Sequence, residues 1–398
     1  MPHRRPSHYI TDPAGLETLC RRLAASPRLA LDTEFVGEDS FVPRLELIQV
    51  ADAEESAAID FPAVAARGSL ECLWNVLCDQ GVEKIVHAGR QDLELVAAHA
   101  GHTPTPFFDT QVAAAMVGYG SQVAYAGLVQ RVTGKRLAKS HTFTNWSQRP
   151  LTSDQITYAL EDVHFLLPIY DHLRARLKTL DREGWVQEEF ERMQATLGER
   201  AREPQDRYQR IRGWDNLHPR AAAVLRALAA WREGEAKRRN VPRGRVFRDE
   251  VLLQLARQVP TRAEELRGIR GVHPSEAERN GEAVLALIAR AAALPSSEWP
   301  VVPRERKPDP KASGHVELLQ AVLKARALQK DIAPSVLASV PDLQELVEAK
   351  QNREALDLPI LRGWRHKLAG DMLLQVLDGT MTVSIDHETG KLRVTPVP

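Results

Sequence analysis

The chain has 398 residues, 43% of them hydrophobic, and its 53 Lys and Arg residues balance 53 Asp and Glu residues. This length predicts two or three domains, because a single hydrophobic core rarely grows beyond ~250–300 residues. The zero net charge gives no sign of a polyanionic partner. The absence of any apolar run of about 18 residues argues against a membrane span.

The N-terminus and the cysteines favour the same cellular location. Residues 1–10 include two arginines but no apolar stretch after them, so they do not resemble a secretory signal. Cys20, Cys72 and Cys78 form no Cys-x-x-Cys pair, which argues against a disulfide framework and against a zinc site. We therefore expect a protein of the reducing cytoplasm.

Residues 28–115 alternate short apolar runs with helical patterns. Strands are predicted at 28–35, 44–51, 56–60, 84–88 and 106–109, and helices at 70–78 and 91–99. Asp109 or Thr110 is expected to cap the next helix, and one long helix is expected over Thr152–Leu177, capped by Thr152 or Ser153. The pattern predicts a mixed five-stranded sheet with helices on both faces.

The remainder of the chain is mainly helical in pattern. The predicted segments are a connector helix and linker at 179–212, a helical domain at 213–292, a linker rich in proline and charge at 293–313, a second helical domain at 314–379 and a hairpin at 380–398. Residues 201–250 contain 13 Lys and Arg against 7 Asp and Glu. Such a basic segment is one way to hold a polyanion, and a solvated helical surface is the alternative.

Three short motifs contain the candidate catalytic side chains. Asp32 and Glu34 lie on the same face of the first predicted strand, because side chains alternate along a strand. Neighbouring carboxylates of this kind are tolerated when a cation lies between them. Asp92 lies in the first turn of a helix, where an acid also complements the helix dipole. Tyr158 and Asp162 are four residues apart and share a helix face.

In this order, over the stretch from Asp32 to Asp162, the motifs resemble the DEDD superfamily of 3′→5′ exonucleases, which has a ribonuclease H-like fold. The histidine branch of the superfamily has histidine five residues before the last Asp, where this chain has Thr157, so the resemblance is to the tyrosine branch. The stretches HAGRQDLELV, FFDTQVAAAMVGYG and KRLAKSHTFTNWSQRPLTSDQITYALEDVHFLLPIY are similar to ribonuclease D.

The resemblance implies that two divalent ions, Mg²⁺ or Mn²⁺, are the cofactors. Two such ions ~3.5–4 Å apart stabilise the attacking and leaving oxygens of a phosphodiester, and these hard cations prefer carboxylate oxygens. By resemblance, Asp32 bridges both metals, Glu34 and Asp162 complete the site that activates water, and Asp92 supports the second metal through waters. Tyr158 orients the attacking water, since a phenol of pKa ~10 is a poor base.

Residues 213–292 resemble an HRDC domain, a helical module that helps to bind nucleic acid in its family. Its candidate RNA contacts are Arg238, Arg239 and Arg243. In the first domain the candidates are Lys139 and Arg149, with a plain surface role for Arg149 as the alternative. Residues 314–379 resemble a second, degenerate HRDC domain, whose acidic residues favour packing over nucleic-acid binding.

The resemblance thus implies a catalytic domain over 1–178 followed by one or two all-α HRDC domains. It implies a metal-dependent 3′→5′ exoribonuclease that releases 5′-mononucleotides and matures the 3′ ends of precursor tRNA and other small structured RNAs. A DNA exonuclease of the proofreading type and an inactive RNA-binding scaffold are the alternatives. The stretch GKRLAKS lacks the spacing of a Walker A motif, so no nucleotide cofactor is expected. We expect a monomer with no membrane partner.

Overall fold

The computed structural model describes residues 6–37, 40–137, 144–197, 204–302, 310–352 and 357–397. The chain forms two compact units, each with its own hydrophobic core. The larger unit comprises Met1–Glu34, Leu45–Leu197 and Pro308–Pro398, and the smaller unit comprises Phe35–Arg44 and Gly198–Lys307. Within the described ranges, no helix combines the length and apolar character needed to cross a bilayer.

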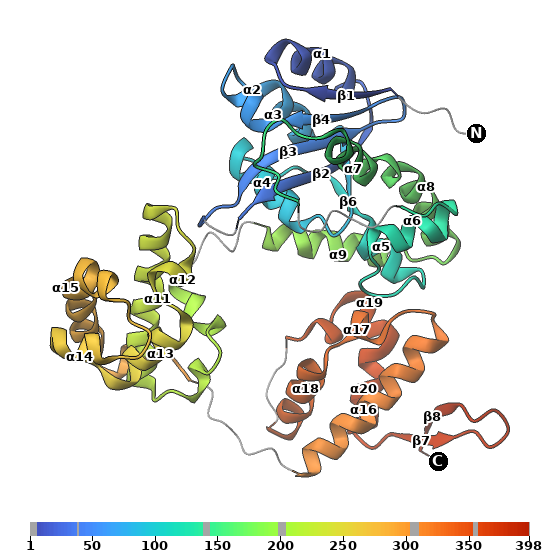
Figure 1. The fold of residues 1–398 in the computed structure, drawn as a ribbon. Coiled ribbons are helices and arrows are strands. Elements are labelled where there is room, and N and C mark those ends of the chain that lie inside the picture. The colour runs from blue at the N-terminus through green and yellow to red at the C-terminus, as the bar shows by residue number, and fades with distance from the viewer. Residues whose placement is uncertain are drawn as a thin grey trace. The chain divides into compact units, whose positions relative to one another are not determined.

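A mixed sheet forms the centre of the first part of the larger unit (Figure 1). Its strands, in spatial order, are β1 (Ser7–Ile10), β4 (Ser56–Asp60), β3 (Arg44–Ala51), β2 (Arg28–Val36), β5 (Glu83–Val86) and β6 (Phe107–Asp109). Strand β1 runs parallel to β4, β3 runs antiparallel to β4, and β5 runs parallel to both β2 and β6.

The expected five strands are present, but the prediction of a five-stranded sheet is wrong because β1 adds a sixth strand at the edge. Only four residues long, β1 is too short for side-chain alternation to distinguish it from a loop. Its position is decided by pairing with a distant partner, since Ser7 lies opposite Ser56 and Ile10 lies opposite Ile59.

Helices flank this sheet (Figure 1). They are α1 (Pro13–Leu23), α2 (Phe61–Ala65), α3 (Glu71–Cys78), α4 (Arg90–Ala100), α5 (Thr110–Met116), α6 (Tyr125–Thr133), α7 (Ser153–His164), α8 (Leu166–Thr179) and α9 (Glu183–Thr196). Two predicted caps are confirmed. Asp109 accepts hydrogen bonds from the first turn of α5, and Thr152 forms a capping box with Gln155 at the start of α7.

The single helix expected over Thr152–Leu177 is two helices, separated at Phe165. The cause lies three residues later, at Pro168. Proline has no N–H to donate to the carbonyl of His164, and its ring clashes with that carbonyl, so a continuous α-helix cannot pass this point. Helix α7 therefore ends just after Asp162.

The C-terminal helices of the larger unit share one continuous core with the helices around the sheet. They are α16 (Pro310–Gln329), α17 (Pro334–Leu337), α18 (Val340–Asn352), η4 (Pro359–Leu361), α19 (Gly363–Arg365), η5 (His366–Gly370) and α20 (Asp371–Leu377). The rings of Trp185 and Trp364 stack at a centroid distance of 4.6 Å and join α9 to α19. Strands β7 (Met381–Ile385) and β8 (Leu392–Pro396) form the predicted hairpin.

The smaller unit is helical. Its elements are η1 (Pro204–Arg210), η2 (Trp214–Asn216), α11 (Pro219–Arg239), α12 (Arg243–Val246), α13 (Asp249–Gln258), α14 (Ala263–Gly268), α15 (Pro274–Ala292) and η3 (Ser296–Glu298). Helix α11 is central, since η1, α12, α13 and α15 all pack against it. Its buried side chains include Leu225 and Leu228, which explains why the segment is helical despite its many arginines.

Candidate active site

Three carboxylates from distant parts of the chain converge beside β2. One oxygen from each of Asp32, Glu34 and Asp162 lies within 4.8 Å of the others, and all three residues are partly buried. Alternation along β2 places the first two on one face, and the capped helix α7 supplies the third. The sequence-based expectation that these acids meet in space agrees with this geometry.

Asp92 lies beside this group but outside it. It occupies the first turn of α4, is 8% exposed, and accepts a hydrogen bond from the hydroxyl of Thr33. After burial, its charge is one of the causes that raise the pKa of Asp32. Thr33 lies on the opposite face of β2 from its two acidic neighbours, and no motif in the sequence indicates its contact with Asp92.

The crowding of these acids opposes their ionisation. Burial, followed by the charges of Asp162 and Asp92, raises the pKa of Glu34 to about 8. Burial also raises the pKa of Asp162 to about 7, and that of Asp32 well above its ordinary range. A cation between the carboxylates would relieve both effects, and a donor set of oxygen atoms alone suits Mg²⁺ or Mn²⁺. The residues present therefore fit a divalent metal site.

Tyr158 lies one helical turn before Asp162, and its hydroxyl is hydrogen-bonded to that carboxylate. Burial, followed by the charges of Asp162, Glu34 and Asp32, raises its pKa above the ordinary value for tyrosine. The phenol therefore keeps its proton at neutral pH and can act as a hydrogen-bond donor or acceptor, but not as an ionised base. The ring of the buried Trp146 packs against the tyrosine ring and helps to orient it, with 6.1 Å between the two ring centroids.

The loop before α4 is held by Asp109, which the sequence indicated only as a helix cap. This fully buried carboxylate accepts hydrogen bonds from the backbone N–H groups of Ala88 and Gly89, at 3.1 and 3.0 Å. A side chain at position 89 would meet Val86 at 2.3 Å, so only glycine fits there. These contacts fix the start of the helix that carries Asp92.

The candidate RNA contact Arg149 is engaged within the protein. Its Nε donates to Asp60 Oδ2 at 2.6 Å, and Nη1 donates to the carbonyl oxygen of Trp146 at 2.6 Å. Asp60 is 1% exposed, so this arginine neutralises a buried carboxylate. The other candidate in this domain, Lys139, lies outside the described residues.

The three candidates in the smaller unit also have carboxylate partners. The pairs are Arg238 with Glu235 at 2.7 Å, Arg239 with Glu276 at 2.9 Å and Arg243 with Glu233 at 2.6 Å. Arg238 and Arg243 keep part of their guanidinium surface open, whereas Arg239 is more enclosed. Their contact with RNA stays a prediction.

Known proteins resemble this chain over most of its length. The sequence profile of the 3′-5′ exonuclease family matches residues 7–178, and that of the HRDC domain matches residues 221–288. Ribonuclease D of Granulibacter bethesdensis is 39% identical over 393 residues, which cover 97% of this chain and 96% of the relative. Ribonuclease D of Acidiphilium cryptum is also 39% identical, over 96% of this chain and 97% of the relative.

The fold is also similar to that of a solved exoribonuclease. The crystal structure of Escherichia coli RNase D, described as an exoribonuclease involved in structured RNA processing, matches with a TM-score of 0.82 at 30% identity. The match covers 93% of this chain and 98% of that chain. The predicted fold class, an α/β exonuclease domain followed by HRDC helices, is confirmed apart from the extra strand. The chain therefore belongs to the ribonuclease D family and is a hydrolase of the 3′→5′ exoribonuclease type.

Proposed function

We propose that this protein trims the 3′ tails of precursor tRNA and other small structured RNAs, releasing one 5′-mononucleotide at a time. The observation that carries the proposal is the convergence of Asp32, Glu34 and Asp162 in a chain of the ribonuclease D family. Three such acids, brought together from a strand and a distant helix, make a site for phosphodiester hydrolysis with divalent cations.

We assign the residues as follows. Asp32, Glu34, Asp92 and Asp162 hold two divalent ions, Mg²⁺ or Mn²⁺, which when bound stabilise the charge on the attacking and leaving oxygens. We assign Asp32 the central role. Burial raises its pKa well above the ordinary range, and the charges of the other three carboxylates raise it further. Asp92 is fastened by Thr33 outside the group of three, which suits a role through intervening waters.

Tyr158 has a separate role in this proposal. Its protonated hydroxyl lies beside Asp162 and orients the water that attacks the terminal phosphodiester. Candidate contacts to the RNA backbone are Lys139 in the exonuclease domain and Arg238, Arg239 and Arg243 in the HRDC domain. We assign Arg149 the alternative role within the protein, because it pairs with the buried Asp60.

The test is cleavage of a tRNA that carries a short 3′ extension and a 5′ label, with Mg²⁺ or with EDTA. We expect a ladder of products that shortens from the 3′ end and stops near the mature end, and no cleavage with chelator. A circular RNA of the same sequence is the matched control, because it has no 3′ end to attack. Cleavage of the circle would contradict an exonuclease.

The same assay addresses the alternatives. A DNA oligonucleotide of matched sequence, cleaved faster than the RNA, would favour the proofreading type of exonuclease. RNA binding without any cleavage would favour an inactive scaffold.

We further infer that the enzyme acts as a monomer in the cytoplasm, where the free thiols of Cys20, Cys72 and Cys78 remain reduced. Light scattering of the purified protein tests the first of these inferences.

A further inference from the structure

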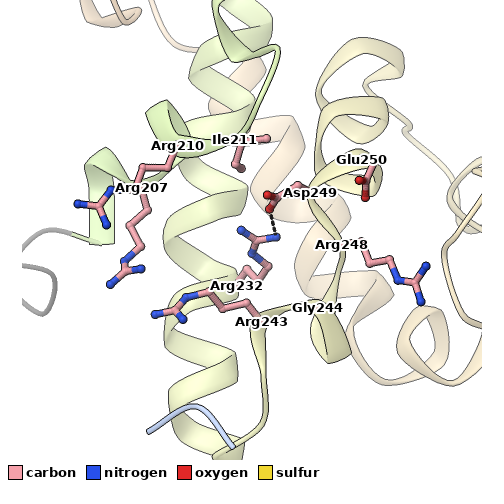
Figure 2. A pocket seen from close by; sticks show the side chains of 9 residues that line it. All are labelled: Arg207, Arg210, Ile211, Arg232, Arg243, Gly244, Arg248, Asp249 and Glu250. Atoms are coloured by element: carbon pink, nitrogen blue, oxygen red, sulfur yellow. Dashed lines mark hydrogen bonds and ion pairs between the residues drawn. The ribbon is translucent and has the colours of Figure 1, made fainter. Parts of the chain in front are cut away.

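The smaller unit contains an arginine-rich pocket (Figure 2). Its lining shares no residue with the carboxylate cluster. Its volume is about 470 Å³. Five arginines line it, namely Arg207, Arg210, Arg232, Arg243 and Arg248. Two acids at the start of α13 also line it, so the lining carries three more positive than negative charges, five against two.

Arg232 is the most buried of these arginines, at 6% exposure. Its Nη1 donates to Asp249 at 2.7 Å and to the carbonyl oxygen of Phe247 at 2.9 Å, and Figure 2 shows its guanidinium directed at Asp249. Its Nε–H has no hydrogen-bond partner among the described residues. Among the described residues, Asp249 is the one carboxylate that pairs with it, and this side chain is 50% exposed. The positive charge of Arg232 is therefore only partly compensated, which favours an anion in the pocket.

The other arginines differ in how they are engaged. Arg207 and Arg243 both pair with Glu233, at 3.1 and 2.6 Å, so one carboxylate serves two guanidinium groups. Arg210 and Arg248 are exposed, and within the described part of the chain no carboxylate pairs with either. A guanidinium group without a carboxylate partner can donate two parallel hydrogen bonds to the oxygens of a phosphate.

The lining also indicates which part of a nucleic acid would enter. Among the described residues that line the pocket none is aromatic, so its lining offers a base no aromatic ring to stack on. The arginine-rich lining without an aromatic ring therefore favours a backbone phosphate over a base.

The pocket is built from two parts of the chain. Arg207 and Arg210 belong to η1, which precedes the residues 221–288 matched by the HRDC profile, whereas the other three arginines lie within that match. An HRDC domain without η1 would therefore lack two of the five cations.

We propose that this composite pocket binds one backbone phosphate of the single-stranded RNA that the enzyme degrades. The proposal rests on the proposed function for its ligand, but the pocket binds its phosphate without metal or catalysis. The contact is independent of base sequence, because only phosphate and guanidinium groups take part.

The first test changes charge. The full-length variant Arg210→Glu is compared with Arg212→Glu, whose exposed arginine lies two residues further on and outside the pocket. Binding of a labelled 20-nucleotide oligo(A) RNA is measured in EDTA at several KCl concentrations. We expect Arg210→Glu to weaken binding about tenfold and to reduce the slope of log K against log salt by about 0.7, the value for one phosphate of a single strand. Arg212→Glu should change neither by a comparable amount.

The second test changes volume without changing charge. A side chain at Gly244 would enter open space beside the lining, and one at Gly234 on α11 would enter open space away from it. Gly244→Leu should weaken RNA binding several-fold, and Gly234→Leu should leave it as in the unmodified protein. Circular dichroism melts of all four variants verify that they fold.

The outcomes of these tests distinguish failure of the pocket proposal from failure of the proposed function. If the pocket variants bind RNA as tightly as their controls, the pocket proposal is wrong even when cleavage with Mg²⁺ is normal. If the unmodified protein binds RNA in EDTA through the pocket but never cleaves it, the proposed function fails while the pocket stands. Competition by millimolar inorganic phosphate tests the source of the ligand. Displacement of RNA at low millimolar phosphate would overturn the assignment to a backbone phosphate and indicate a free phosphate site.

Discussion

Arg365 holds the carboxylate of Glu189 with two hydrogen bonds in the interior of the larger unit. Its Nη2 lies 3.0 Å from Glu189 Oε2, and Nη1 donates to Oε1. Its Nε donates to the carbonyl oxygen of Val336 at 2.8 Å. The pair joins α9, beside the exonuclease sheet, to the C-terminal helices. The C-terminal helices are thereby packed into the same core as the exonuclease domain.

This ion pair predicts a dependence of stability on pH. Burial raises the pKa of Glu189, but the hydrogen bonds and charge of Arg365 outweigh burial and hold it below the usual value. A depressed pKa stabilises the fold above the unfolded pKa of about 4.3, and that stability is lost as the pH falls through the lower folded pKa. Glu189→Gln should therefore cost about 1–3 kcal/mol at pH 7, and the cost should shrink below pH ~4.3.

The measurement is urea unfolding of Glu189→Gln and the unmodified protein from pH 7 to pH 3.5. Glu191→Gln, which changes an exposed acid on the same helix, is the control. A stability difference that stays constant across this pH range would show that the ionised pair is not its source.

Removing one carboxylate of the cluster should abolish metal-dependent cleavage. In Asp32→Asn or Asp162→Asn the metal site loses a charged ligand, so we expect cleavage of the 3′-extended RNA to fall at least ~10³-fold. RNA binding in EDTA should change less than about threefold, because the carboxylates are negatively charged and do not attract the RNA backbone. Asp154→Asn, at an exposed acid in the first turn of α7, is the matched control and should retain activity. Full activity in either cluster variant would refute the site.

Tyr158→Phe should slow the chemical step without loss of the metals. The substitution keeps the ring against Trp146 and deletes the hydroxyl that orients water, so kcat should fall about 10²-fold. Mn²⁺ affinity, measured by calorimetry, should remain within about threefold, since all four carboxylates are intact. Tyr119→Phe removes a hydroxyl that bonds to His172 and serves as the control. A large loss of Mn²⁺ affinity in Tyr158→Phe would assign the phenol to the metal site instead.

A substitution at Arg149 distinguishes an ion pair within the protein from a contact with RNA. Because its guanidinium pairs with the buried Asp60, Arg149→Met should lower the free energy of unfolding by about 1–3 kcal/mol, the cost of leaving a buried group without its partner. We expect a smaller effect on RNA affinity, less than about threefold at a temperature where the variant is folded. Arg136→Met, at an exposed arginine, is the control for general loss of charge. Normal stability combined with weak RNA binding would favour the role as an RNA contact.

The sequence by itself was sufficient for features set by local geometry. Alternation along a strand placed Asp32 and Glu34 on one face, and helical spacing aligned Tyr158 with Asp162. The caps at Asp109 and Thr152 followed from side chains that reach the backbone only a few residues away. Such contacts span a few residues, so the chain's local pattern contains them.

Tertiary structure alone decided the features that depend on contacts between distant segments. Nothing near Arg149 in the sequence indicates Asp60, 89 residues away, and nothing near Thr33 indicates Asp92. The four-residue strand β1 exists because β4 accepts it as an edge partner. The core shared by the sheet and the C-terminal helices also depends on contacts between distant segments. An apolar pattern in the sequence indicates a buried face, but it does not identify the segment that covers that face.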